Sequence, residues 1–467
     1  MNASGGPPEL SVDHPTRDAI YAKITRRLLP FLFICYVLNF IDRVNISFAK
    51  VQFNEDLGVS DSAYGLGVGL FFVGYVLFEV PSNLLMQRIG ARRTVSRIMC
   101  LWGLVSACMM FVRTPGELYF ARILLGAAEA GFFPGVILYL TYWYPSALRA
   151  RITSLLLMAV AVAGVLGGPV SGWIMANMTG TLGLRGWQWL FLLEGVPAIV
   201  AGVVAYFYLD DRPSEAKWLT AKERAIVEYN LYADECLKEN RGRHSFMASF
   251  ADPRVYIVAL GYMVVPWAGS VLNFWGPSVI RKSGITEIWH VGLLSSVPYI
   301  IGASLMLVIS RHSDRHLERR WHFASMGFLA AVGIALLPSV STNWLATIGF
   351  LTLATIGYLA AVALFWTIPP AYLTGAAAAG GIALISSIGQ AGGLLAPTVI
   401  GWINELTGSL AAGLYVVAAV VVTGALIVII GLPANKLRER DKVGKAHLPQ
   451  TGSGARGEPT LSAEGKA

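Results

Sequence analysis

The chain has 467 residues, of which 55% are hydrophobic and only 14% are charged, and its formal net charge is +8. Soluble proteins carry about 25% charged residues, and the mean hydropathy here is +0.58, so the composition excludes an ordinary soluble domain and indicates a membrane protein. Nucleic-acid binding is not expected, because the basic residues cluster at the ends of apolar segments, which is typical of membrane orientation.

Twelve segments are long and apolar enough to cross a bilayer, which takes about 20 residues of helix. The first six are expected at Leu28–Ala49, Ala63–Met86, Thr94–Val112, Gly116–Tyr142, Ile152–Met175 and Gly186–Leu209. The second six are expected at Pro253–Val279, Trp289–Ser310, His322–Leu337, Trp344–Trp366, Ala377–Ile403 and Leu410–Leu432. The first segment is not expected to be a cleaved signal peptide, because it is too long and lacks a clear small-residue cleavage site.

These segments predict an all-α integral membrane protein made of two pseudo-symmetric six-helix bundles. We expect a tail at 1–27, the first bundle at 28–209, a linker at 210–252, the second bundle at 253–433 and a disordered tail at 434–467. The linker contains a short amphipathic stretch with Trp218 and Ile226 on one face. Arginine is concentrated in the loops after the second, fourth and eighth helices, which predicts that both termini are cytoplasmic in a multi-pass inner-membrane protein.

The two halves repeat a basic loop after the second helix of each bundle. The loops read "NLLMQRIGARR" (83–93) and "SRHSDRHLERR" (310–320). Either loop alone could simply anchor orientation, but their matched positions in the two halves make chance a poorer explanation. The loops contain Gln87, Arg88, Arg92, Asp314 and Arg315, and the family resemblance given below implies that these are gating residues.

Four charged residues lie deep inside the predicted first and fourth helices. Each costs several kcal/mol in a bilayer and therefore requires a partner or a function. Asp42 and Arg43 are adjacent in "NFIDRVN" and point in different directions, so they must interact with different neighbours. Arg122 and Glu129 are seven residues apart, on one face of the fourth helix. Static salt bridges between these two pairs are one interpretation, and a transport role is the other.

Six motifs in order, among them "NFIDRVNISFA", "GYVLFEVPSNLL", "RILLGAAEAGFFPG" and "RHSDRHLERRWH", resemble the anion:cation symporter family of the major facilitator superfamily. The resemblance implies that the first and fourth helices line a central cavity, and that Arg43 and Tyr75 contact substrate. Asp42 and Glu129 are then candidate proton carriers, and Arg122 a second anion-binding cation. Tyr75 could instead be a packing aromatic. The family usually has Asp where this chain has Gln87, which weakens the expected gate contact.

The C-terminal half offers polar and aromatic side chains in place of charges. Candidate substrate contacts are Asn273, Trp275, Trp366, Ser386 and Gln390, on helices interrupted by Gly and Pro. The two tryptophans could also be packing or interfacial residues. Many members of the family carry Asn at the positions of Ser386 and Gln390. The identity of the substrate therefore cannot be inferred from that of a relative.

Together these features predict proton-coupled symport of a small organic anion, such as tartrate, a hexuronate or an aldonate, by alternating access. An exporter of drugs or metabolites, a sodium-coupled or uncoupled carrier, and a membrane sensor are the alternatives. No enzyme is expected, because neither a nucleophile with its base nor a metal constellation is found. No cofactor or metal is predicted either, since the four cysteines lack paired spacing and no phosphate-binding GxxxxGK[ST] motif occurs. The expected partners are the anion, protons and lipid, and the expected state is a monomer.

Overall fold

The computed structural model describes residues 14–239, 253–316, 318–369 and 376–432. All regular structure in these ranges is helical, and twelve spans are long and apolar enough to cross a membrane. The prediction of an all-α membrane protein with twelve spans is therefore confirmed. The predicted disordered tail at 434–467 and part of the linker lie outside the described residues.

The spans of the N-terminal half are mostly single helices. They are α1 and α2 (His14–Val44, Ile46–Leu57), α3 (Asp61–Ile89), α4 (Ala91–Cys108), α5 and α6 (Pro115–Glu129, Phe132–Thr141), α7 (Ser146–Asn177) and α8 (Gly186–Tyr208). Short 3₁₀ turns follow α4 and α7, at Met109–Phe111 and Thr181–Gly183.

The C-terminal half begins with a span built from several pieces. These are α11 (Pro253–Tyr262), α12 (Val264–Ser270), a π-helical segment (Val271–Trp275) and α13 (Gly276–Lys282). The remaining spans are α14 (Ile288–His316), α15 (Arg320–Leu336), α16 (Trp344–Phe365), α18 (Ala376–Thr407) and α19 (Leu410–Gly431).

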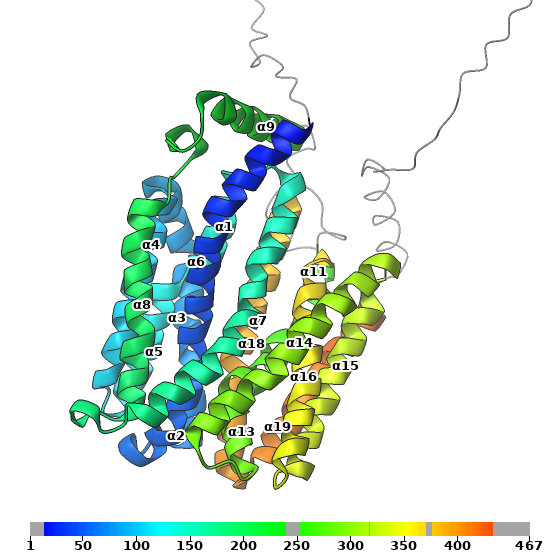
Figure 1. Ribbon diagram of the computed structural model, residues 1–467. Helices are drawn as coiled ribbons and strands as arrows, with labels where there is room; N and C mark the ends of the chain where they lie inside the picture. Colours follow the sequence, from blue (N-terminus) through cyan, green and yellow to red (C-terminus); the bar gives the residue numbers. More distant parts are fainter. Residues whose placement is uncertain (1–13, 240–252, 317, 370–375, 433–467) are drawn as a thin grey trace, which may run out of the picture.

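The helices form two bundles, α1–α8 and α11–α19, that lie side by side (Figure 1). The linker helix α9 (Ala221–Glu239) crosses one end of the N-terminal bundle, which we call the α9 end. The turns around α2 and α13 lie at the opposite end, the α2 end.

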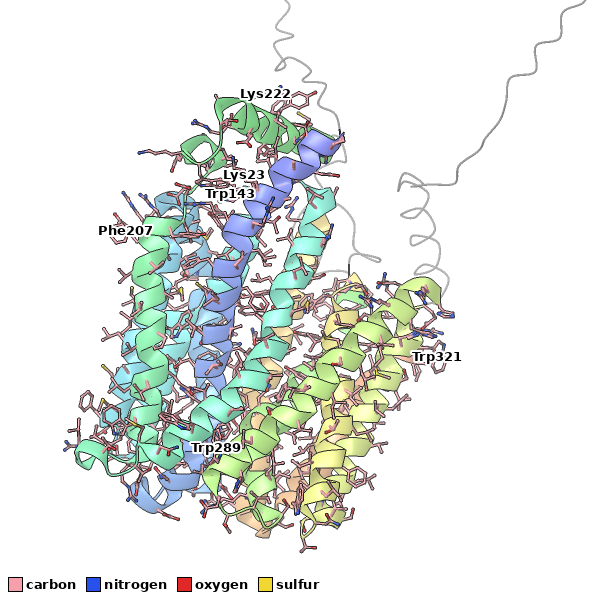
Figure 2. The ribbon with its side chains drawn as sticks, in the orientation of Figure 1. Lys23, Trp143, Phe207, Lys222, Trp289 and Trp321 are labelled. Atoms are coloured by element: carbon pink, nitrogen blue, oxygen red, sulfur yellow. The ribbon has the colours of Figure 1, made fainter. Side chains whose placement is uncertain are left out.

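The linker is fixed to the N-terminal bundle at the α9 end. The Lys23 ammonium on α1 lies 2.8 Å from the Glu223 carboxylate on α9, and the Trp143 and Trp218 rings stack with centroids 5.7 Å apart. Lys23, Trp143 and Lys222 are all at this end, whereas Trp289 lies near the α2 end (Figure 2). The described part of the linker is therefore packed on the N-terminal bundle.

The two bundles touch closely toward the α2 end. A Cβ on Gly168 of α7 would lie 2.5 Å from the Gly292 carbonyl oxygen on α14, and a Cβ on Gly292 would lie 2.4 Å from the Gly168 oxygen. On α18, the Asn404 amide donates to the Asp61 carboxylate at the start of α3. Glycine is thus required for the backbone contact that closes this end.

We expect Gly168→Val to open this contact, because the side chain would overlap the Gly292 carbonyl oxygen. Overpacking of this kind costs about 1–3 kcal/mol. Spin-label distances between α7 and α14 near this end should lengthen. Gly349→Val is the matched control, because a Cβ at Gly349 meets nothing within 4 Å. Equal distances in both variants would contradict the role of Gly168.

A charged contact at the α2 end joins the last turn of α2 to the residue that precedes α8, outside the candidate membrane spans. Arg185 Nε donates to Asp56 Oδ2 at 2.8 Å and its Nη2 donates to Oδ1, while Trp187 Nε1 donates to Oδ2 at 2.8 Å. The Arg185 hydrogen bonds lower the pKa of Asp56. A lowered pKa means that this stabilisation is present above the unfolded pKa of about 3.9 and is lost as the pH falls further.

Asp56→Asn should therefore lower the melting temperature at neutral pH and have no effect at strongly acidic pH. The loss is at most about 1 kcal/mol, because the Arg185 side chain is 51% exposed. Thermal unfolding across the pH range checks this, with the exposed neighbour Glu55→Gln as control. A difference in melting temperature between Asp56→Asn and wild type that grows as the pH falls would contradict the lowered pKa of Asp56.

Three spans are interrupted in the middle of the molecule. The first breaks at Asn45, directly after Asp42 and Arg43, and the fourth breaks after Glu129, where Gly131 has φ +84°. The seventh carries the π-helical segment that contains Asn273. The sequence-based boundaries treated the first and fourth spans as continuous helices. The breaks matter because each one lies next to a candidate site residue.

Candidate functional site

A cavity of about 190 Å³ lies between the two bundles. It is lined by Arg43, Tyr75, Asn273, Trp366, Ser386 and Gln390, together with apolar residues and the tyrosines Tyr36, Tyr262 and Tyr358. Six of the eight predicted substrate contacts thus meet at one place. Among the described residues that line the cavity, Arg43 is the one with a formal charge.

Arg43 forms an ion pair with Glu129 at the edge of this cavity. Its Nη2 donates to Glu129 Oε1, with the arginine side chain 18% exposed and the glutamate fully buried. The guanidinium carbon also lies 5.2 Å and 5.3 Å from the ring centres of Phe71 and Tyr75. Arg43 therefore presents a positive charge to the cavity, and the aromatic rings support its orientation.

Asp42 points away from the cavity into the N-terminal bundle. It is fully buried, and its Oδ1 accepts hydrogen bonds from Ser106 and, at 3.2 Å, from Asn45 Nδ2. Its Oδ2 has no hydrogen-bond partner in the described part of the chain. The adjacent acid and base thus have separate surroundings, as their helical spacing requires.

Arg122 and Trp275 do not line the cavity. Arg122 is fully buried, its Nε donates to the Gly67 carbonyl oxygen at 3.3 Å, and its guanidinium carbon lies 5.0 Å from the Phe71 ring centre. Trp275 lies toward the α2 end, where the Lys50 ammonium is 3.6 Å from its ring centre and 2.7 Å from Asp61. This places Trp275 in the closed contact between bundles, because the π-helical segment changes the direction of the residues that follow Asn273.

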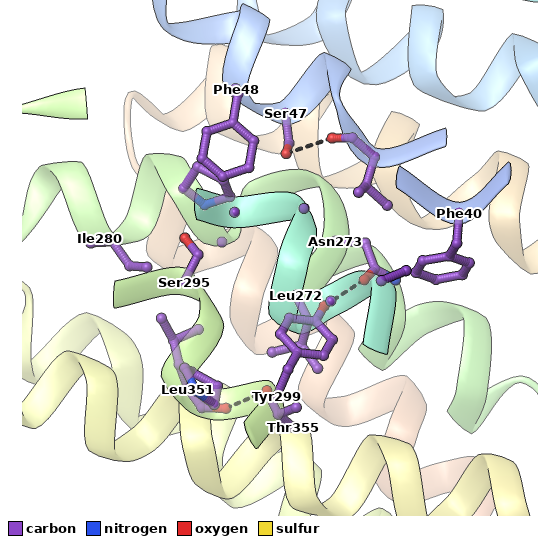
Figure 3. Close-up of a pocket in the computed structure, with 18 residues that line it drawn as sticks. Phe40, Ser47, Phe48, Leu272, Asn273, Ile280, Ser295, Tyr299, Leu351 and Thr355 are labelled. Carbon is purple, nitrogen blue, oxygen red and sulfur yellow. Dashed lines mark hydrogen bonds between the residues drawn. The ribbon is translucent and has the colours of Figure 1, made fainter. Parts of the chain in front are cut away.

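The C-terminal wall of the cavity supplies hydrogen-bonding groups without charge. Asn273 Oδ1 accepts from the Tyr299 hydroxyl at 2.6 Å, and Figure 3 shows the two side chains pointing toward each other. The buried Ser270 hydroxyl has no partner among the described residues. The Trp366 ring packs edge-on against Tyr262, with centroids 5.2 Å apart. These groups suit the hydroxyls and carbon faces of a polyhydroxy solute.

A second, smaller cavity of about 40 Å³ is drawn in Figure 3. Its lining combines Phe40 and Phe48 of the first span with Tyr299 of α14 and Thr355 of α16. It shares Phe40, Val44 and Asn273 with the main cavity. Because its lining is mostly apolar, it suits the packing of closed bundles better than a charged solute.

The candidate gating residues lie at the α9 end. Gln87 and Arg88 are exposed at the end of α3, and the Arg92 amide donates to Asp211 at 2.7 Å. Asp314 is paired with Arg319 at 3.1 Å, and Arg315 is exposed. Arg92 thus contacts the start of the linker, and Asp314 contacts its own C-terminal bundle.

Sequence reasoning missed two residues of charged type that are buried in the described part of the chain. Lys50 is only 7% exposed and Glu194, on α8, only 5% exposed. Glu194 could have been found, because it is a lone acid in the apolar stretch "LFLLEGVPA", and such a residue requires an explanation. Lys50 stands at the predicted end of a helix, so its burial against Trp275 needed the tertiary structure.

Twelve membrane helices in two bundles around a cavity with a buried charge define a secondary membrane transporter. A family model described as the Major Facilitator Superfamily matches residues 32–397, and the chain belongs to this superfamily. The protein is thus a multi-pass membrane transporter and not an enzyme, and its relatives agree with the resemblance to anion:cation symporters.

The chain is similar to curated proteins over most of its length. It is 44% identical to a proposed tartrate transporter of Agrobacterium vitis, over 88% of this chain and 94% of that protein. It is 38% identical to a quinolone resistance transporter of Acinetobacter baumannii, over 86% of this chain and 93% of that protein. Among solved structures, a D-xylose-proton symporter has a TM-score of 0.70 at 14% identity, covering 88% of this chain and 98% of that one. The last similarity concerns the fold alone.

Proposed function

We propose that this protein imports a small organic anion, a sugar acid or a dicarboxylate such as tartrate, together with protons across the bacterial inner membrane. The observation that carries the proposal is Arg43, a cavity-lining cation paired with a buried glutamate. A guanidinium binds a carboxylate in a bidentate fork. The Agrobacterium vitis relative named for tartrate transport supports the same substrate class.

The Arg43–Glu129 pair suggests how substrate and proton are linked. A substrate carboxylate that binds Arg43 competes with Glu129 for the same guanidinium. Glu129 is fully buried, and a buried carboxylate without its cation is strongly disfavoured. Glu129 then takes up a proton as the anion binds. Asp42 is the second proposed proton carrier, because it is fully buried with one unpartnered oxygen among the described residues. Arg122 is proposed as the cation that balances Asp42 once its proton leaves.

Alternating access fits the arrangement of the two bundles. The α2 end is closed by the Gly168–Gly292 contact and by Asn404 on Asp61. We propose that the basic α9 end faces the cytoplasm, with both termini. Gln87, Arg88, Arg92, Asp314 and Arg315 would then form the gate that closes when the α2 end opens.

Export of drug-like molecules is the second candidate. It is favoured by the relative named for quinolone resistance and by the aromatic groups Trp366, Tyr262 and Tyr36 at the cavity. The hydrogen-bonding C-terminal wall favours a hydroxylated anion instead. The direction of transport distinguishes the two candidates.

The proposal is tested with the purified protein and a panel of tartrate, aldonates, hexuronates, glucarate, phthalate and amino acids. At least one organic anion should raise the melting temperature and be accumulated by proteoliposomes under an inward proton gradient. Stabilisation by cationic or neutral amphiphiles alone would refute the organic-anion class. Uptake that follows a sodium gradient at constant pH would refute proton coupling.

A further inference from the structure

A third buried carboxyl, Glu194, lies within the N-terminal bundle on α8. Its side chain is 5% exposed, and its Oε1 accepts a hydrogen bond from Ser171 of α7 at 2.7 Å. Its Oε2 has no hydrogen-bond partner in the ranges that the structure describes. A carboxylate left in this condition would be strongly disfavoured, whereas a neutral carboxyl tolerates burial far better.

Glu194 and Asp42 have a common neighbour at the break of the first span. Asn45 is fully buried, its Nδ2 donates to Asp42 Oδ1 at 3.2 Å, and it lies near the Glu194 carboxyl without a hydrogen bond to that carboxyl in this structure. The Asn45 Oδ1 has no partner among the described residues. This oxygen can therefore accept a hydrogen bond from a protonated carboxyl beside it.

The charged residues around Asp42 and Glu194 do not balance the negative charge that two carboxylates would carry. Asp42 is the charged neighbour of Glu194, and α4 and α7 contribute the hydroxyls of Ser106 and Ser171. Asp42 is also influenced by Glu129 and Arg122 of α5. On α8 itself, Arg185 stands nine residues before Glu194, about 14 Å along the helix, and is already paired with Asp56.

We propose that Glu194 is a further proton-binding site, and that it titrates together with Asp42 as a pair across Asn45. The N-terminal bundle then holds three protonatable carboxyls, with Glu129 at the cavity and the Asp42–Glu194 pair behind it. Loss of one proton from the pair makes loss of the other less favourable, since like charges at one amide repel. The inference rests on the proposed proton coupling for its biological role, but not for the protonation itself.

Infrared spectroscopy of the purified protein in lipid, without any substrate, tests the protonation. Wild type at neutral pH should show carbonyl bands of buried protonated carboxyls, and Glu194→Gln should remove one of them. Ser171→Ala should shift that same band, because it removes the hydrogen bond to Glu194. The exposed Glu228→Gln on α9 is the control and should change nothing in this region.

Two outcomes would overturn the proton site. One is a spectrum that Glu194→Gln and Ser171→Ala both leave unchanged. The other is a protonated band that disappears when sodium replaces potassium at constant pH, which would assign the site to a metal cation. If Glu194→Gln fails to fold, the shift of the carbonyl band in Ser171→Ala provides the same test. The pH titration of that band is then compared with and without Asp42→Asn.

Transport then tests the coupling role separately. If the Glu194 proton is co-transported, the Glu194→Gln variant should bind the anion normally. Its accumulation ratio for the anion should fall about tenfold for each unit of pH gradient. An unchanged accumulation ratio would remove the coupling role. Failure of every organic anion to bind would refute the proposed function while leaving the infrared result intact.

Discussion

Arg43→Ala is expected to lower the affinity for the transported anion by about 10- to 150-fold and to destabilise the protein. The first effect follows from the loss of charged hydrogen bonds, worth about 1.5–3 kcal/mol. The second follows because Glu129, fully buried, would lose its cation, at a cost of about 3–5 kcal/mol unless it takes up a proton. Anion-dependent thermal stabilisation and the melting temperature measure the two effects.

Two further variants separate binding from structure at this position. Arg43→Lys keeps the charge for Glu129 but loses the planar fork, so the protein should stay folded while the apparent KM for the anion rises about tenfold. Arg43→Gln combined with Glu129→Gln should restore stability without restoring affinity, because no buried charge is left unpaired. An unchanged KM for Arg43→Lys would mean that Arg43 is a structural residue.

Asp42→Asn is expected to abolish proton-driven accumulation of the anion and to leave exchange across the membrane measurable. The amide fills the same space beside Ser106 and Asn45 but cannot release or accept a proton. Counterflow needs only the movement of the loaded carrier, so it should continue in proteoliposomes that have anion on both sides.

Asp56→Asn is the matched control for Asp42→Asn. It replaces an acid of the same bundle by its amide, but in the last turn of α2, outside the candidate membrane span. It should retain accumulation at neutral pH. Normal accumulation by Asp42→Asn would exclude Asp42 from proton transport, and loss of counterflow as well would indicate a folding defect instead.

Much of the fold was predictable because membrane spans obey a simple requirement of length and polarity. The ninth span, the shortest of the predicted helices, was expected at His322–Leu337, and α15 covers Arg320–Leu336. The breaks at Asn45 and Gly131 were not predicted, since both lie in stretches apolar enough to continue a helix. What stabilises these breaks is tertiary contact: a Cβ on Gly131, for example, would lie 2.6 Å from the Ser82 hydroxyl.

The sequence identified those site residues whose burial in a membrane is costly. It did not identify the contacts that depend on the direction in which a side chain points. Asp42, Arg43, Arg122 and Glu129 stood out as charges in apolar segments, but their partners depended on the breaks. The sequence left the pairing open, and the structure pairs Arg43 with Glu129. Trp275 was expected at the cavity as an aromatic residue on a helix interrupted by Gly and Pro, but it lies toward the α2 end against Lys50, which only the tertiary structure shows.

The uneven distribution of charge between the cavity walls has a consequence for how this transporter can diversify. The proposed anion contact, Arg43, is on α1, and the buried carboxyls Asp42, Glu129 and Glu194 are on α1, α5 and α8, whereas the opposite wall of the cavity contributes Asn273, Ser386 and Gln390. Under the proposed mechanism, substitutions on that wall can alter which hydroxyls are recognised without changing the charges proposed to drive accumulation. A new solute could therefore be acquired, in nature or in a mutant library, by changing a few neutral side chains in a carrier whose energy coupling stays intact.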